Sequence, residues 1–218
     1  ESLLAQNYPS DILAIIVVDD RSDDKTGEIV ESFCKEHSQI QLIEQRSCEP
    51  NLSPKKQALE LGIGKSDGEI IVVTDADCVH DVDWIASLTR YLEPDVGMVV
   101  GQARFIVSDA DPIWQYMQAL DFQAQSVLSA GLISAGIPFT CSGASLAYRR
   151  KLYDDVKGWE GLKHLISGDD ELLMAKAHEQ EWKIVAAKTE SVVVNTIPVK
   201  SFRELWHQRI RWGSKGLH

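Results

Sequence analysis

The sequence lacks any long hydrophobic run. The longest unbroken apolar stretch is Ile12–Val18, far short of the roughly 20 residues that a membrane-spanning helix needs. The first residues, ESLLAQNYPSD, have neither the basic start nor the apolar core of a signal peptide. Because the chain opens without Met and stops just after a basic segment, we expect it to be a piece of a longer protein. The missing span therefore says little about the parent.

The sequence also lacks the cysteine spacing of a metal site or a disulfide framework. Its four cysteines, Cys34, Cys48, Cys78 and Cys141, form no CxxC pair and no Cys/His ligand spacing. We interpret them as buried or incidental thiols in a reducing compartment. This pattern argues against a zinc site.

A surplus of basic residues is missing as well. The formal net charge is −11, which argues against nucleic acid as a partner. The charge is unevenly distributed, because residues 198–218 hold five basic residues against one acid and the remainder carries −15. A basic end on an acidic body indicates a specific anionic partner, either a phosphate or a lipid surface.

What the first half does contain is an alternation of short apolar runs and helical patterns. Strands are predicted over residues 12–18, 40–43, 69–74 and 97–101, and helices over 23–35, 53–61 and 82–92. Ser53 is a suitable cap for the second helix, and Pro54 suits its first turn. This alternation predicts an α/β domain with a mostly parallel sheet and helices on both faces.

The second half follows a different pattern. Helices are predicted over residues 112–128, 149–156, 169–180 and 202–212, with a strand at 144–148, strand-like runs in 184–194 and a loop at 131–138. No repeat or linker divides the chain. We therefore expect one domain over residues 1–218.

Two predicted strands end in acidic residues. The first runs into Asp19 and Asp20, and the third into Asp75 and Asp77. Ligands of open parallel sheets bind beyond the carboxyl ends of the strands, and carboxylates gathered there favour a hard divalent cation, Mg²⁺ or Mn²⁺. We expect Asp75 and Asp77, on an extended strand end, to point to one side. The alternative is that such acids only face solvent or cap the next helix, as we expect for Asp23 and Asp24.

Five segments, in order, carry a family resemblance: VVDDRSDDKT, SDGEIIVVTDADC, CSGASLAYRR, SGDDELLM and HQRIRW. They resemble family 2 glycosyltransferases of the GT-A fold, in the membrane-associated branch of cellulose, hyaluronan and poly-N-acetylglucosamine synthases and ceramide glucosyltransferase. The resemblance implies a nucleotide-sugar and metal-binding half at 1–104 and an acceptor and catalytic half at 105–218. We expect the family's first strand, which helps to bind the base, to be missing from this chain.

The resemblance assigns roles to individual acids. Asp20 corresponds to the acid that contacts the nucleotide, while Asp75 and Asp77 form the DxD motif, with Asp77 the better direct metal ligand. Asp170 corresponds to the catalytic base, and Asp169 stands where the family has Glu. The alternative is that Asp169 and Asp170 only satisfy a helix N-terminus.

The last motif is QxxRW, formed by Gln208, Arg211 and Trp212. On a helix these residues share one face, where the resemblance implies contacts to the diphosphate and the acceptor sugar. The alternative is an amphipathic helix whose apolar residues pack inward; a position along a membrane surface is also open.

The resemblance touches two further segments. Lys55 or Lys56 could lie near the base or the phosphates, and a solvated helix face is an equal alternative. Cys141-Ser142-Gly143 corresponds to a segment that borders the acceptor.

The resemblance as a whole implies an inverting, Mn²⁺- or Mg²⁺-dependent glycosyltransferase that moves a sugar from a nucleotide diphosphate, with UDP favoured, to a hydroxyl of a glycan or lipid. The catalytic domain would be cytoplasmic and the full-length protein a multi-pass protein of the cell membrane. Two other classes stay open. They are a nucleotidyltransferase, and a non-catalytic, Mg²⁺-binding receiver-like module.

Overall fold

The computed structural model describes residues 1–213; the side chain of Arg211 lies outside the described part. In chain order the elements are β1 (Ile15–Asp19), α1 (Thr26–Glu36), β2 (Ile40–Glu44), α2 (Pro54–Gly64), β3 (Ile70–Val73), α3 (Trp84–Arg90), β4 (Val96–Val100), β5 (Gln102–Phe105), α4 (Ile113–Ser134), β6 (Leu146–Arg149), α5 (Arg150–Asp155), α6 (Asp169–Glu179), β7 (Lys183–Ala186), the 3₁₀ turn η1 (Glu190–Val192), β8 (Val193–Thr196) and α7 (Phe202–Gly213).

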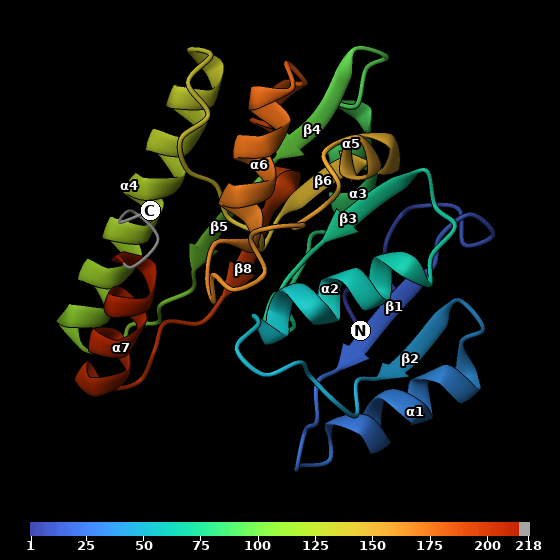
Figure 1. The fold of residues 1–218 in the computed structure, drawn as a ribbon. Coiled ribbons are helices and arrows are strands. Elements are labelled where there is room, and N and C mark those ends of the chain that lie inside the picture. The colour runs from blue at the N-terminus through green and yellow to red at the C-terminus, as the bar shows by residue number, and fades with distance from the viewer. Residues whose placement is uncertain (214–218) are drawn as a thin grey trace.

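The strands form three hydrogen-bonded groups (Figure 1). The central group has the order β3-β6-β4-β7, in which β4 and β7 are parallel and only β6 runs against its neighbours. β1 pairs in parallel with β2, and β5 in parallel with β8. The expected alternation of strands and helices is therefore present, and the reversed strand comes from the second half of the chain.

Apolar side chains cover both faces of the central sheet. On one face, Met98 and Val100 of β4 join a core built with α2, α5 and α6. On the other face, Val99 joins a core built with α3. All five residues of β4 are buried, as expected for a strand covered on both sides.

Local sequence explains how α2 is placed against this sheet. Ser53 caps the helix by accepting a hydrogen bond from the Lys56 amide, and Pro54 occupies the first turn. At its other end Gly62 packs closely on β1, because an added Cβ would lie 3.2 Å from Val18. α2 thus lies between β1 and the core of the central sheet.

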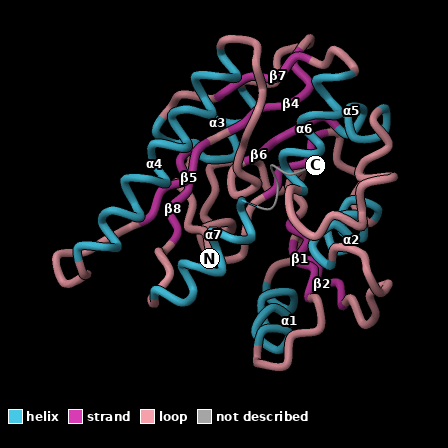
Figure 2. Tube along the Cα trace, turned by 60° about the vertical axis from the view of Figure 1, so that its left-hand side comes forward, coloured by secondary structure: helices cyan, strands magenta, loops and turns pink. Residues whose placement is uncertain are grey.

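The long helix α4 packs beside the β5–β8 pair, and α7 lies next to it (Figure 2). Phe105 of β5 stacks on Phe122 of α4 with ring centroids 4.3 Å apart, and Ser126 donates a hydrogen bond to the Ala103 carbonyl. Within the described residues, no helix is long and apolar enough to cross a bilayer.

Three local expectations differ from the structure. The helix expected to end at residue 128 continues to Ser134, so the start of the expected loop is helical. Strand β5, directly after Gly101, was not expected from the sequence. Ala76 and Asp77 lie in a turn after β3 rather than on an extended strand.

Candidate active site

Asp169 and Asp170 begin α6 and are both 8% exposed. Gly168 precedes them with φ of 76°, a left-handed conformation that glycine adopts without strain. The Asp170 carboxylate accepts hydrogen bonds from the Gly143 amide at 2.7 Å and the Glu171 amide at 2.9 Å. The segment Cys141-Ser142-Gly143 therefore lies directly against the acidic pair.

Lys55 joins this pair to the acids after β3. Its Nζ lies 2.9 Å from Asp75 Oδ1 and 3.3 Å from Asp169 Oδ2. These three residues and Asp170 are called the Lys55 cluster below. It brings together two acidic motifs that are far apart in the sequence.

The surroundings of the Lys55 cluster raise the pKa values of both Lys55 and Asp169. Partial burial by itself would lower the pKa of Lys55, of whose side chain 45% is exposed. The carboxylates of Asp169 and Asp75 outweigh that effect, so the pKa is raised. Burial, and then the charge of Asp170, raise the pKa of Asp169, while Lys55 opposes the rise. Lys55 is thus held firmly as a cation between acids.

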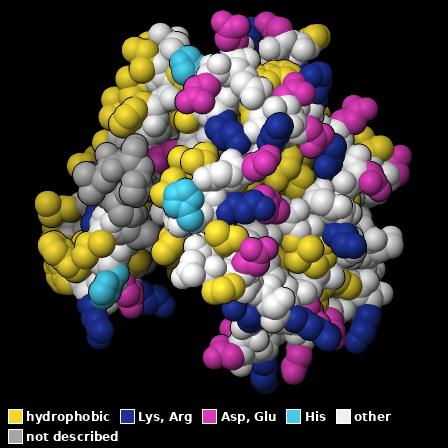
Figure 3. All heavy atoms as spheres, in the orientation of Figure 1, with side chains coloured by type: hydrophobic (Ala, Val, Ile, Leu, Met, Phe, Trp, Pro, Cys, Tyr) yellow, Lys and Arg dark blue, Asp and Glu magenta, His cyan; other side chains and the backbone are white. Residues whose placement is uncertain are grey.

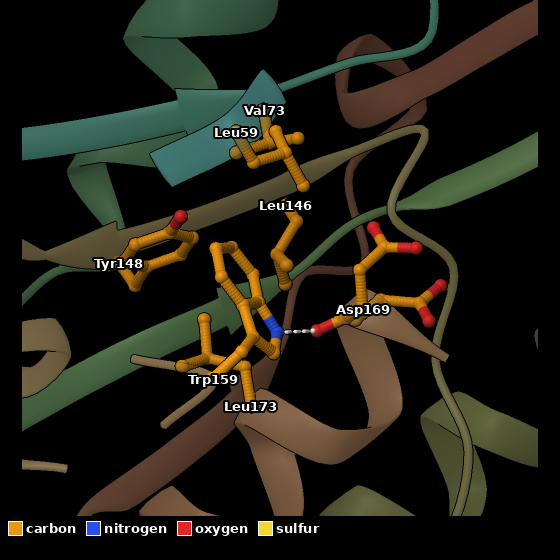
Figure 4. Close-up of a pocket in the computed structure, with 8 residues that line it drawn as sticks. Leu59, Val73, Leu146, Tyr148, Trp159, Asp169 and Leu173 are labelled. Carbon is orange, nitrogen blue, oxygen red and sulfur yellow. Dashed lines mark hydrogen bonds between the residues drawn. The ribbon is translucent and has the colours of Figure 1, made fainter. Parts of the chain in front are cut away.

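An apolar cavity lies behind the acidic pair (Figure 4). Trp159 lines it and donates a hydrogen bond from Nε1 to the Asp169 carbonyl at 2.7 Å. The other walls are Leu59, Val73, Leu146, Tyr148 and Leu173. These side chains limit the water that can approach the carboxylates from behind.

The two DxD acids have different surroundings. Asp75 is paired with Lys55, whereas Asp77 is exposed and accepts a hydrogen bond from the Thr196 hydroxyl at 3.1 Å. The expectation that both point to one side of a strand is not met, because the chain turns at Asp77 and the two acids contact α2 and β8 respectively. Asp77 is the more accessible oxygen ligand.

The oxygen chemistry of Asp75 and Asp77 fits a hard divalent cation. Within residues 1–213, no group of three or more Asp, Glu, His or Cys is gathered so as to hold a metal by itself. Mg²⁺ is commonly held by one or two carboxylates with substrate phosphates and water completing the shell. Asp77 therefore fits a metal that arrives with a phosphate ligand, and Asp75 would add an oxygen to that metal by exchanging its ion pair with Lys55.

Asp20 lies in a separate part of the site. It is paired with Arg21 at 2.9 Å and accepts a hydrogen bond from Gln45 at 3.2 Å. An open depression beside it is lined by Asp19, Arg21, Ser22, Glu44, Gln45 and Arg46. Both strands of the β1–β2 pair end at this depression, where the sequence predicts nucleotide contacts.

The QxxRW helix packs on α4. Gln208 accepts a hydrogen bond from the buried Gln118 at 3.1 Å, and Trp212 stacks on Phe122 with centroids 5.7 Å apart. Gln208 and Trp212 therefore share the face of α7 that meets α4. The side chain of Arg211 lies outside the described residues.

Two features of the site had no firm signal in the sequence. The sequence left Lys55 and Lys56 either near the base or phosphates or on a solvated helix face. It predicted neither the double ion pair of Lys55 nor the complete burial of Lys56. The Ser53-Pro54 helix start was the only signal, since it places both lysines in the first turn of α2.

The sequence model described as "Glycosyltransferase like family 2" matches residues 1–214. The chain belongs to this family. The two alternative classes, nucleotidyltransferase and receiver-like module, are not supported by this match.

Curated relatives are similar over nearly the whole chain. The probable glycosyltransferase YdaM of Bacillus subtilis is 27% identical over 94% of this chain and 48% of its own length. The beta-monoglucosyldiacylglycerol synthase of Synechocystis is 26% identical over 99% of this chain and 44% of its own length. The poly-beta-1,6-N-acetyl-D-glucosamine synthase of Staphylococcus epidermidis is 26% identical over 99% and 50%. The chain spans about half the length of these relatives.

Solved structures confirm the GT-A fold. The mannosyltransferase PcManGT of Pyrobaculum calidifontis, solved with GDP-Man and Mn²⁺, has a TM-score of 0.73 and 24% identity over 96% of this chain and 54% of that one. TarS 1–349 of S. aureus, solved with UDP, has a TM-score of 0.63 and 18% identity over 90% and 54%. At these identities the likeness establishes the fold alone.

Proposed function

We propose that this family 2 chain is the catalytic domain of an inverting glycosyltransferase that uses a UDP-sugar and a divalent metal. The Lys55 cluster is the observation that carries the proposal. It connects the DxD acids with a buried acidic pair at a helix start, and inverting transfer needs a donor site and a base on its acceptor side.

In this proposal Asp170 is the general base. An acceptor hydroxyl loses its proton to Asp170 as its oxygen bonds to the anomeric carbon, and the bond from that carbon to the diphosphate oxygen breaks. The amides of Gly143 and Glu171 orient the carboxylate. Asp169, tied to Lys55 and by its carbonyl to Trp159, supports the position of Asp170.

The donor would bind across residues 1–104. Asp20 would contact the nucleotide at the depression beside β1 and β2, and Asp77, with Asp75, would hold Mn²⁺ or Mg²⁺. The metal would neutralise the diphosphate leaving group. Gln208, Arg211 and Trp212, in the half at 105–218, would border the acceptor, a glycan or lipid hydroxyl. Relatives named for a lipid product and a glycan product are both similar to this chain.

We further propose that the full-length protein works at a membrane, with this domain on its cytoplasmic side. Exposed apolar side chains gather along α4 and α7, at the left edge of Figure 3. They are Ile113, Met117, Leu120, Val127, Leu128, Phe202, Trp206 and Ile210. This group, the α4–α7 apolar face, also argues against the alternative in which the apolar residues of α7 all pack inward.

A donor screen on the full-length protein tests the proposed function. UDP-glucose, UDP-N-acetylglucosamine and GDP-mannose would each be incubated with Mn²⁺, with Mg²⁺ and with EDTA, and nucleotide release would be measured. We expect release from a UDP-sugar only with metal. Release from none of the donors, or release that EDTA does not affect, would contradict the proposal.

A further inference from the structure

Lys56 is a fully buried lysine in the first turn of α2, with 0% of its surface exposed. An ammonium group taken out of water is costly unless its donors are satisfied. A lysine at such a place therefore indicates specific acceptors rather than a solvated helix face.

The acceptors are backbone carbonyls of one loop. Lys56 Nζ donates hydrogen bonds to the carbonyl oxygens of Leu165 and, at 2.9 Å, Ser167. Ser53, also buried, donates from its hydroxyl to the Ile166 carbonyl at 2.9 Å and from its amide to the Lys163 carbonyl at 2.7 Å. The start of α2 thus binds four carbonyls within residues 163–167, a segment that has no helix or strand of its own.

This loop leads directly into the acidic pair. Only Gly168 separates Ser167 from Asp169 at the start of α6. The neighbouring Lys55 binds the carboxylates of Asp75 and Asp169 from the same turn of α2. Two consecutive lysines therefore hold the start of α6. Lys55 binds the carboxylate of Asp169, and Lys56 binds the backbone just before Gly168.

We propose that Lys56 is a positioning residue, which holds residues 165–167 so that Asp170 stays aligned with the donor acids on the β3 side. The inference deepens the proposed function, because it depends on Asp170 acting as the base. A displacement of about 1 Å in reacting groups is enough to lower turnover on the order of a hundredfold. The binding of the nucleotide, by contrast, uses residues outside the loop.

The test compares Lys56→Met with Lys163→Met in the full-length protein. Methionine keeps the length and apolar stem of lysine but donates no hydrogen bond. Lys163 is a matched control, since its ammonium joins the same loop to the same helix through Glu60 at 2.7 Å but is partly exposed. UDP binding with Mn²⁺ would be measured by calorimetry, and kcat by nucleotide release from the active UDP-sugar.

We expect Lys56→Met to lower kcat per UDP-binding site by roughly ten- to a hundredfold while the Kd of UDP stays within about twofold. Counting active sites by UDP binding removes the effect of partial unfolding. Lys163→Met should stay within about twofold in both quantities. A kcat per binding site near wild type in Lys56→Met, or an equal fall in both variants, would overturn the inference.

Hydrogen exchange provides a readout that does not depend on activity. In Lys56→Met the amides of residues 168–172 should exchange at least tenfold faster, while those of β4 should not change. If Lys56→Met does not fold, Ser53→Ala should show the same exchange changes at smaller size, because it removes the bond to the Ile166 carbonyl together with the cap of α2. If the wild type transfers no sugar, the proposed function fails, and unchanged exchange at 168–172 would separately refute the role of Lys56.

Discussion

The β1–β2–α1 layer is less deeply buried than the central sheet. α1 contributes no buried residue, and every residue of β1 is only half-buried. All five residues of β4, by contrast, are buried between two apolar cores. The proposed nucleotide acid Asp20 lies on the loosely packed side, and the acidic pair Asp169-Asp170 lies on the tightly packed one.

This difference matches the demands of the two tasks. A base must stay within hydrogen-bonding reach of one hydroxyl, and its position is held by packing and by backbone amides. Asp170 has such support from Gly143 and Glu171. A nucleotide pocket can adjust as its ligand binds, and Asp20 keeps 28% of its side chain exposed.

The largest expected effect comes from removing the proposed general base beside the central sheet. Asp170→Asn should lower kcat by about 10²-fold or more, since loss of a general base costs roughly 10² to 10⁴, with UDP affinity nearly unchanged. Steady-state kinetics and calorimetry check this. Glu179→Gln, at the exposed far end of α6, is the control. Near-wild-type turnover in Asp170→Asn would leave the pair as a structural helix start.

The packing contrast itself can be tested by one kind of truncation in both regions. Leu88→Ala, at a position with 0% exposure, should lower the free energy of unfolding by about 2–5 kcal/mol. Ile29→Ala on α1, where the side chain is 55% exposed, should change it by less than about 0.5 kcal/mol. Urea unfolding measures both. Similar losses at the two positions would remove the contrast.

A third change tests the proposed metal ligand Asp77, which follows strand β3 of the central sheet. Asp77→Asn should weaken Mn²⁺-dependent UDP binding by about tenfold or more, because an amide is a poorer ligand for a hard cation. Calorimetry with and without Mn²⁺ measures this. Asp67→Asn, at an exposed position before β3, should bind as wild type does. Equal metal-dependent affinity in Asp77→Asn would move the metal site elsewhere.

The sequence predicted the packed side well because its signals are local. Apolar runs identified β3, β4 and β6, and Ser53 with Pro54 identified the start of α2. Asp75, Asp169 and Asp170 were all chosen as site residues, and the structure brings them together around Lys55. Their assigned roles stay predictions.

What the sequence could not predict depends on contacts between distant segments. Lys56 is buried because carbonyls more than a hundred residues away accept its hydrogen bonds, and no local pattern encodes that. The turn at Ala76 and Asp77 was missed because the apolar run that predicts the strand does not indicate the backbone conformation after its end. Strand β5 was missed because it is a short run with two polar residues, and its pairing partner β8 is distant in the sequence.

The smallest expected effect concerns a third region, the α4–α7 apolar face, which is neither a core nor a ligand pocket. We expect the full chain of residues 1–218 to bind vesicles of phosphatidylcholine with phosphatidylglycerol at low salt and to be released at high salt, because exposed charges are screened. Arg203 is exposed on α7 beside Phe202. Since one basic residue near an anionic surface is worth about 1 kcal/mol, Arg203→Gln should weaken vesicle binding about fivefold.

The control for this effect is a basic residue in the β1–β2–α1 layer, away from the α4–α7 apolar face (Figure 1). Lys25→Gln, at an exposed position just before α1, should bind vesicles as the unchanged chain does, because Lys25 does not lie beside that face. Flotation assays measure both variants. Equal losses in the two would mean that attraction is spread over the surface, and no binding at low salt would leave the apolar face to a protein partner.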